Sequence, residues 1–182
     1  DTALNTAIDA VDKIRDTAFS HDRLFIVEVM GRDTGFIALN VGLAGGAEEI
    51  FLPESPLNIE KVIEHIQKSM KRGKMSSILV TAEGQKPGRA YDLAESIRKK
   101  SGLESKVCVL GHLQRGGSPT ALDRIIASRM GASAVDALLK GMKNCMIGIQ
   151  NDQIITMPFH EVVAQKKPIK LELMQLVQIL ST

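Results

Sequence analysis

The stretch Gly111–Pro119, which reads Gly-His-Leu-Gln-Arg-Gly-Gly-Ser-Pro, concentrates residues that can bind an anion. It follows the apolar run Val107–Leu110 and precedes a helical pattern that begins near Thr120, so it is typical of a turn from a buried strand into a helix. Its glycines permit close approach of the backbone, while His112 and Arg115 place two nitrogen-rich side chains at one turn. The stretch therefore favours an anionic ligand. A tight turn with solvated polar side chains is the alternative.

Two other strand-like runs also end in a charged residue beside glycine, one at Arg32 and the other at Glu83. Because the carboxyl ends of parallel strands share one edge of a sheet, both residues are expected to lie near the turn that carries His112 and Arg115. Arginine forks match phosphate oxygens and a carboxylate suits sugar hydroxyls, so a phosphorylated sugar would satisfy the whole set. The alternative is a structural salt bridge between Glu83 and one of the arginines.

The elements that must position these residues alternate regularly along the chain. An amphipathic helix over Asp1–Ala18 comes first. The expected order is then strand Leu24–Val29, helix Asp33–Leu43, strand Glu49–Leu52, helix Asn58–Arg72, strand Ser77–Thr81, helix Tyr91–Lys100, strand Lys106–Leu110, helix Thr120–Lys140, strand Cys145–Ile149, edge strand Gln153–Met157 and closing helix Leu171–Leu180. Apolar strands separated by helices predict an α/β fold, a three-layer sandwich with a mostly parallel sheet covered on both faces.

Composition narrows the class of protein. The 182 residues, of which 44% are hydrophobic, suit one domain or one lobe of a larger protein, and the abrupt start suggests a segment of something longer. No apolar run is long enough for a membrane span and no secretory signal is visible. Cys108 and Cys145 lie in apolar runs, which favours buried free thiols in the cytoplasm. A net charge of +2, one Tyr and no Trp give little support for nucleic-acid binding.

Five segments of the chain, taken in order, resemble bacterial 6-phosphofructokinase. They are Asp1–Asn5, Glu28–Arg32, Gly42–Glu48, Ala82–Gly84 and Leu110–Thr120. The resemblance covers only the carboxyl-terminal half of that family, so residues 1–182 are expected to be its sugar-phosphate-binding half and to have its fold. The family's amino-terminal nucleotide-binding half, with a Gly-rich loop and a Thr-Ile-Asp-Asn-Asp segment that supplies the catalytic base, has no counterpart here.

The resemblance implies an activity and a site. In this family, fructose 6-phosphate receives the γ-phosphoryl group of ATP on its 1-hydroxyl, with Mg²⁺, to give fructose 1,6-bisphosphate in glycolysis. By resemblance, Arg32 supports the transition state and lines the sugar together with Met30 and Gly31. Glu83 accepts hydrogen bonds from sugar hydroxyls, and His112 and Arg115 hold the 6-phosphate. The resemblance assigns no certain metal ligand to this chain, and the chain alone is expected to be inactive.

The resemblance also implies a homotetramer whose active sites are completed by neighbouring subunits. Arg23 and Lys106 match the cations that reach a partner's sugar phosphate, although bacterial relatives have arginine where this chain has Lys106. Lysine keeps the charge and loses the planar fork, so the contact is expected to be weaker. A solvated surface charge is the alternative for both residues.

A separate effector site for nucleoside diphosphates or phosphoenolpyruvate is implied between subunits. Its members in this chain are Arg15, Gly46, Glu48, Arg72 and Lys74, with Met75 where a further basic residue is common. Glu48 is expected to serve magnesium or to switch between ligands. The alternative for the segment around Arg72 is plain helix termination, with Gly73 at the cap and cations that suit the helix dipole.

Two other functions stay open at this point. A pyrophosphate-dependent relative has the same fold, and the residues that select the phosphoryl donor lie in the amino-terminal half. A non-catalytic sugar-phosphate-binding module belongs to a different class. The upstream sequence would separate these alternatives, because it either contains the nucleotide loop and the aspartate pair or does not.

Overall fold

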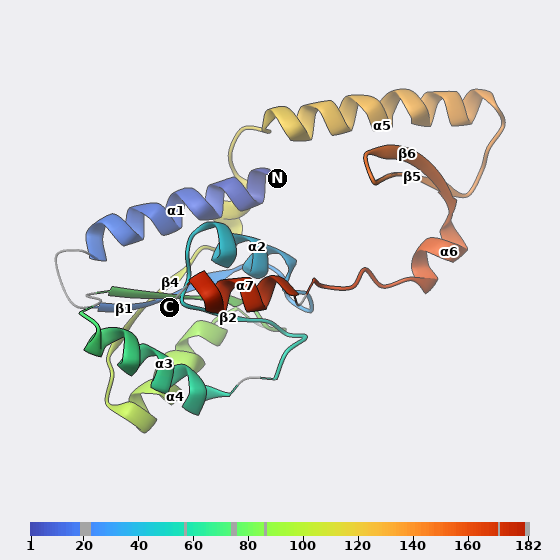
Figure 1. Cartoon of the computed structure of the whole chain (residues 1–182). Helices are drawn as coiled ribbons and strands as arrows, with labels where there is room; N and C mark the ends of the chain where they lie inside the picture. The colour runs from blue at the N-terminus through green and yellow to red at the C-terminus, as the bar shows by residue number, and fades with distance from the viewer. Residues whose placement is uncertain (19–22, 57, 74–75, 86, 171, 181–182) are drawn as a thin grey trace. The chain divides into compact units, whose positions relative to one another are not determined.

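A computed structural model describes residues 1–18, 23–56, 58–73, 76–85, 87–170 and 172–180, and they form two compact units (Figure 1). The sheet unit comprises Thr2–Gly117 and Ile169–Thr182. The hairpin unit comprises Asp1 and Ser118–Pro168. No helix among the described residues is long and apolar enough to span a membrane.

Four parallel strands form the centre of the sheet unit. They are β1 (Arg23–Val29), β2 (Glu49–Phe51), β3 (Ser76–Ala82) and β4 (Ser105–Val109), in the spatial order β2-β3-β1-β4. All three neighbouring pairs are parallel, and Glu28 of β1 lies between Thr81 of β3 and Val109 of β4. The predicted α/β class with a parallel sheet is therefore confirmed.

Helices cover both faces of this sheet (Figure 1). The helices α1 (Thr2–Ala18), α2 (Phe36–Ala44) and α7 (Glu172–Leu180) cover one face, and α3 (Ile59–Lys71) and α4 (Arg89–Ser101) cover the other. Alternate residues of β1 enter the two cores: Val27 and Val29 pack with α1 and α2, whereas Leu24 and Ile26 pack with α3 and α4. Since each fully buried Val, Leu or Ile stabilises the fold by about 1.5–3 kcal/mol, an apolar residue at nearly every position of β1 holds both helical layers.

The hairpin unit contains α5 (Ala121–Leu139), β5 (Cys145–Gln150), β6 (Gln153–Pro158) and α6 (Phe159–Ala164). The sequence-based placement of Cys145–Ile149 in the parallel sheet is wrong, because β5 pairs antiparallel with β6 in a separate two-stranded sheet. Asn151 and Asp152 have φ angles of 49° and 60°, the left-handed conformation that a two-residue hairpin turn requires. This turn brings the two strands together.

The two cysteines are free and partly buried, Cys108 on β4 and Cys145 on β5. Burial raises the pKa of the Cys108 thiol, so less of the reactive thiolate forms at neutral pH.

Candidate functional site

The carboxyl ends of β1, β3 and β4 lie side by side, as the sequence predicts. Beyond the last paired residues, the Glu83 N–H donates to the Val29 carbonyl at 2.8 Å, and the Leu110 N–H donates to the Glu28 carbonyl at 3.0 Å. The chain continues from β1 into α2 on one face of the sheet and from β3 into α4 on the other. The two connections therefore diverge beyond the strand ends. Open α/β sheets bind ligands in such crevices.

The turn after β1 has a constrained backbone. At Gly31, an added Cβ would lie 2.3 Å from the Thr34 carbonyl oxygen, so no other residue fits there. The next residue, Arg32, has a φ of 43°, a left-handed conformation that costs free energy in a residue other than glycine. The carboxylate of Glu54 accepts hydrogen bonds from the Gly35 N–H at 2.9 and 3.1 Å, which fixes the end of this turn. The Arg32 side chain is exposed.

The segment after β4 forms a short 3₁₀ helix, η1 (Gly111–Arg115), which is attached to β1 by one buried side chain. Gln114 is 1% exposed, and its Oε1 accepts a hydrogen bond from the Met30 N–H at 2.7 Å. The neighbouring His112 and Arg115 are exposed, and neither makes a side-chain hydrogen bond or ion pair to any residue in the described ranges. Gln114 therefore faces inward and holds η1, while the two nitrogen-rich side chains face outward.

The segment that follows β3 is held by a buried carboxylate of β1. Glu28 is 1% exposed and its two oxygens accept hydrogen bonds from the Gly88 and Ala90 N–H groups, each at 2.8 Å. These bonds satisfy N–H groups at the start of α4 and place the loop that begins with Glu83. No ion pair within the described part of the chain includes Glu83, so the alternative of a structural salt bridge to arginine is not observed.

Six predicted residues thus surround one edge of the sheet. We call this set the strand-end site: Met30, Gly31, Arg32, Glu83, His112 and Arg115. Sequence reasoning did not single out Glu28 and Gln114, the two buried residues that hold the site together. The available signal for Glu28 was a carboxylate inside an apolar strand, since a buried charge needs partners.

The other expected cations lie toward the opposite end of the strands. Arg23 is the first residue of β1, and Lys106, the second residue of β4, pairs with Phe25. At about 3.3 Å per residue, the seven steps from Arg23 to Met30 span about 23 Å. Within one chain, Arg23 and Lys106 are therefore at a different edge from the strand-end site.

The expected effector residues are partly brought together. Arg15 donates hydrogen bonds to the carbonyls of Gly45 and Gly46, the latter at 3.1 Å, and Gly46 has a φ of 64°. Glu48 is 2% exposed, and its carboxylate accepts a hydrogen bond from the Ile78 N–H. We call Arg15, Gly46 and Glu48 the Arg15 cluster.

Of the remaining effector candidates, Arg72 lies at the end of α3. Arg72 is exposed and occupies the C-cap position, and Gly73 follows with a φ of 88°. The helix therefore ends with glycine in the left-handed conformation, as the termination alternative predicts. Lys74 and Met75 lie outside the described residues.

The described residues contain no group of three or more His, Cys, Asp and Glu side chains that could hold a metal ion.

These features define an α/β domain with a parallel sheet, whose carboxyl edge presents the exposed side chains of Arg32, His112 and Arg115. The model of the phosphofructokinase family matches residues 1–138, and the chain belongs to that family. It is 53% identical over 181 residues to the ATP-dependent 6-phosphofructokinase of Brevibacillus brevis, and equally to ATP-dependent 6-phosphofructokinase 1 of Thermus thermophilus. Both alignments cover 100% of this chain and 56% of the relative, so the chain spans just over half the length of these curated relatives.

The chain also resembles solved structures of phosphofructokinases. The phosphofructokinase of Saccharomyces cerevisiae matches with a TM-score of 0.82 at 36% identity, over 89% of this chain and 23% of that chain. A pyrophosphate-dependent phosphofructokinase from Marinobacter aquaeolei matches with a TM-score of 0.78 at 29% identity, over 94% of this chain and 48% of that chain.

Proposed function

We propose that residues 1–182 are the sugar-phosphate-binding, carboxyl-terminal half of an ATP-dependent 6-phosphofructokinase. The whole enzyme would transfer the γ-phosphoryl group of ATP to the 1-hydroxyl of fructose 6-phosphate in the cytoplasm, with Mg²⁺, giving fructose 1,6-bisphosphate. The observation that carries this proposal is the strand-end site, where His112 and Arg115 are exposed without side-chain partners among the described residues. The buried Gln114 and Glu28 hold the surrounding loops by hydrogen bonds to the backbone. ATP as the donor rests on the names of the relatives, which are 53% identical.

Each side chain of the site has a role that suits its chemistry. His112 and Arg115 would hold the 6-phosphate, because charged nitrogen donors bind phosphate oxygens strongly. Glu83 would accept hydrogen bonds from sugar hydroxyls, and the Met30–Gly31 backbone would line the sugar. Arg32 would stabilise the negative charge that develops on the transferring phosphoryl group. The catalytic base and the ATP site would come from the amino-terminal half, so this chain alone would bind substrate and not turn it over.

Arg23 and Lys106 would complete the site of a neighbouring subunit in a homotetramer. Their position at the opposite end of the strands supports this, since they are too far from Met30 to serve the site of their own chain.

The Arg15 cluster, with Arg72 and Lys74, would bind a nucleoside diphosphate or phosphoenolpyruvate as effector. The bonds from Arg15 to the Gly45 and Gly46 carbonyls support a guanidinium held in place. In this proposal Glu48, whose carboxylate receives the Ile78 N–H, would discriminate between a metal-bound and a metal-free effector.

A second candidate is a pyrophosphate-dependent phosphofructokinase, favoured by the likeness to the Marinobacter aquaeolei structure. Assays of the whole enzyme with ATP and with pyrophosphate would decide between the donors. If neither donor supports turnover while fructose 6-phosphate binds, the third candidate, a non-catalytic sugar-phosphate-binding module, would hold.

Calorimetric titration of this chain with fructose 6-phosphate tests the central proposal. His112→Ala and Arg115→Ala should each weaken binding by about 1.5–3 kcal/mol, the scale of a hydrogen bond to a charged group. Arg98→Ala is the matched control, because Arg98 is an exposed α4 arginine that pairs with Glu95 at 3.0 Å. Saturable binding that is equally affected by the control, or unaffected by His112→Ala and Arg115→Ala, would contradict the assigned site.

A further inference from the structure

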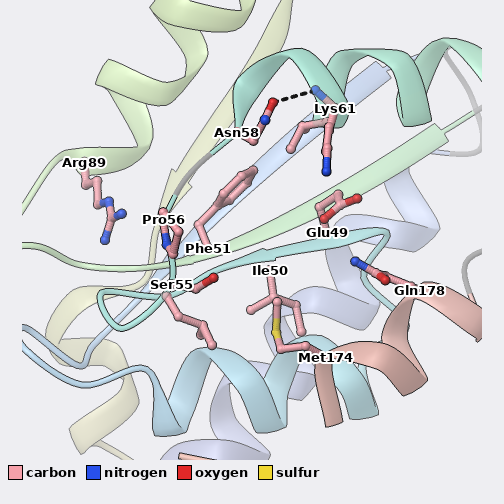
Figure 2. Close-up of a pocket in the computed structure, with 12 residues that line it drawn as sticks. Glu49, Ile50, Phe51, Ser55, Pro56, Asn58, Lys61, Arg89, Met174 and Gln178 are labelled. Carbon is pink, nitrogen blue, oxygen red and sulfur yellow. Dashed lines mark hydrogen bonds between the residues drawn. The ribbon is translucent and has the colours of Figure 1, made fainter. Parts of the chain in front are cut away.

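A cavity of about 170 Å³ opens at the edge strand β2, which β3 separates from β1 (Figure 2). The buried side chains of Ile50 and Phe51 form its apolar floor, with 4% and 5% exposure. Helices from both faces of the sheet supply its walls: Met174 comes from α7, Lys61 from α3 and Arg89 from α4. The cavity therefore combines an apolar floor with polar side chains, among them Asn58 and Gln178, and with two cations at its rim.

Neither rim cation forms an ion pair with a residue in the described ranges, and Lys61 interacts with Glu64 only at longer range. No acidic group in the described part of the chain lies within ion-pair distance of Lys61 or Arg89. By contrast, Lys68 on the same helix as Lys61 pairs with Glu64 at 2.6 Å. The positive charge at the cavity is thus available to an anion.

The single acidic residue that lines the cavity has a partner of its own. A hydrogen bond of 2.8 Å joins Glu49 Oε1 and His65 Nδ1, and both side chains are largely shielded from solvent. Two cations and one carboxylate therefore line the cavity, so its lining carries more positive than negative charge.

Phe51 and Arg89 also border a second cavity of about 250 Å³ between α3 and α4. Both side chains therefore adjoin open space on two sides, and they are neighbours in both cavities. In the view of Figure 2, the Phe51 ring lies between the side chains of Arg89 and Lys61.

We propose that this cavity binds a single-ring aromatic acid, with the ring against Phe51 and the carboxylate or phosphate on the Arg89 guanidinium. The size fits one ring, because an apolar protein cavity of about 150 Å³ accommodates benzene. Arginine presents a planar fork of donors that matches either acid group, and Lys61 adds positive potential on the other side of the ring. This site is independent of fructose 6-phosphate and of the proposed kinase function.

Phenyl phosphate and benzoate are the probes, titrated separately into the ¹⁵N-labelled chain and followed by the backbone amides of residues 49–52 and 58–62. Saturable shifts of these amides are expected with both probes if the acid group is generic, and with one probe if the site selects phosphate or carboxylate. Arg89→Gln should weaken binding about tenfold or more, since it removes a charged hydrogen-bond donor. Lys68→Gln is the matched control and should leave affinity unchanged.

Three results would overturn the proposal. One is an absence of saturable shifts at these amides with either probe. Another is unchanged affinity in Arg89→Gln, a variant that leaves the fold intact because Arg89 makes no side-chain hydrogen bond to the described residues. The last is loss of phenyl phosphate binding in His112→Ala, which would place the probe at the strand-end site instead. Phe51→Leu is an independent test. It should weaken the binding of phenyl phosphate and leave the affinity for inorganic phosphate unchanged.

Discussion

The strand-end site and the Arg15 cluster both gather polar residues around glycine, yet they use those residues in opposite ways. At the strand ends, the buried Glu28 and Gln114 bind the backbone, and His112 and Arg115 are left exposed without protein partners among the described residues. In the Arg15 cluster, the arginine itself binds backbone carbonyls of its own chain.

The difference separates two kinds of polar residue. A group bound to the backbone contributes to folding and is held in a fixed position, whereas an exposed group without protein partners contributes to ligand binding and little to folding. Substitutions should therefore divide into those that lower the free energy of unfolding and those that lower ligand affinity.

The largest loss of stability is expected at Glu28. Glu28→Ala removes the acceptor of the Gly88 and Ala90 N–H groups, and two unsatisfied buried donors cost about 2–5 kcal/mol in the free energy of unfolding. Glu28→Gln should lose less, because the amide keeps one acceptor oxygen. Urea unfolding of the three proteins measures the order, and equal stability of Glu28→Ala and the parent would break the comparison.

The next largest effect is expected at Gln114, a buried residue that binds the backbone and lies between His112 and Arg115 in η1. Gln114→Leu leaves the Met30 N–H without its acceptor and should lower the free energy of unfolding by about 1–2 kcal/mol. It should also weaken fructose 6-phosphate binding, because η1 would no longer be fixed to β1. Calorimetry and urea unfolding test the two effects, and a change in affinity without a change in stability would place Gln114 with the exposed groups.

A smaller effect is expected at Arg15. Arg15→Ala removes partly buried bonds to the Gly45 and Gly46 carbonyls and should cost about 1 kcal/mol of stability. Arg115→Ala, an arginine without such bonds, should change stability by less than about 0.5 kcal/mol. Thermal unfolding of the pair compares them directly, and a reversed order would contradict the division drawn between the two regions.

The smallest effect is expected where charges meet on the open surface. The hydrogen bonds from Arg98 and Lys99 lower the pKa of Glu95, so this carboxylate favours the folded state when ionised. That contribution is present above the ordinary carboxylate pKa of about 4.3 and is lost as the pH falls through the lower folded value. Glu95→Gln should therefore reduce stability slightly at pH 7 and by less at pH 3, as unfolding at the two pH values would show.

Much of the fold could be predicted from local pattern. The strands predicted at Leu24–Val29 and Ser77–Thr81 lie within one residue of β1 and β3, because both runs are apolar on both faces. The helix predicted at Asn58–Arg72 is observed at Ile59–Lys71, where Asn58 accepts the Lys61 N–H as the N-cap. Local signals were strong at these positions.

The hairpin unit shows where local pattern was insufficient. Cys145–Ile149 has the same apolar character as the parallel strands, and nothing in its own residues specifies which strand it pairs with. The Asn151–Asp152 turn decided the pairing, since two residues with positive φ return the chain directly onto itself. The helix α6 carried no periodic pattern long enough to predict.

The sequence alone determined the order of elements, the residues that follow each strand and the resemblance to phosphofructokinase, because periodicity and glycine placement are local properties. Only the tertiary structure decided that β1 lies between β3 and β4, and therefore that its end joins both neighbouring loops. It also decided that Glu28 and Gln114 bind the backbone of segments more than 50 residues away. Burial and hydrogen-bond partners depend on contacts distant in sequence, so the same polar residue types became a frame in one place and a ligand-binding surface in another.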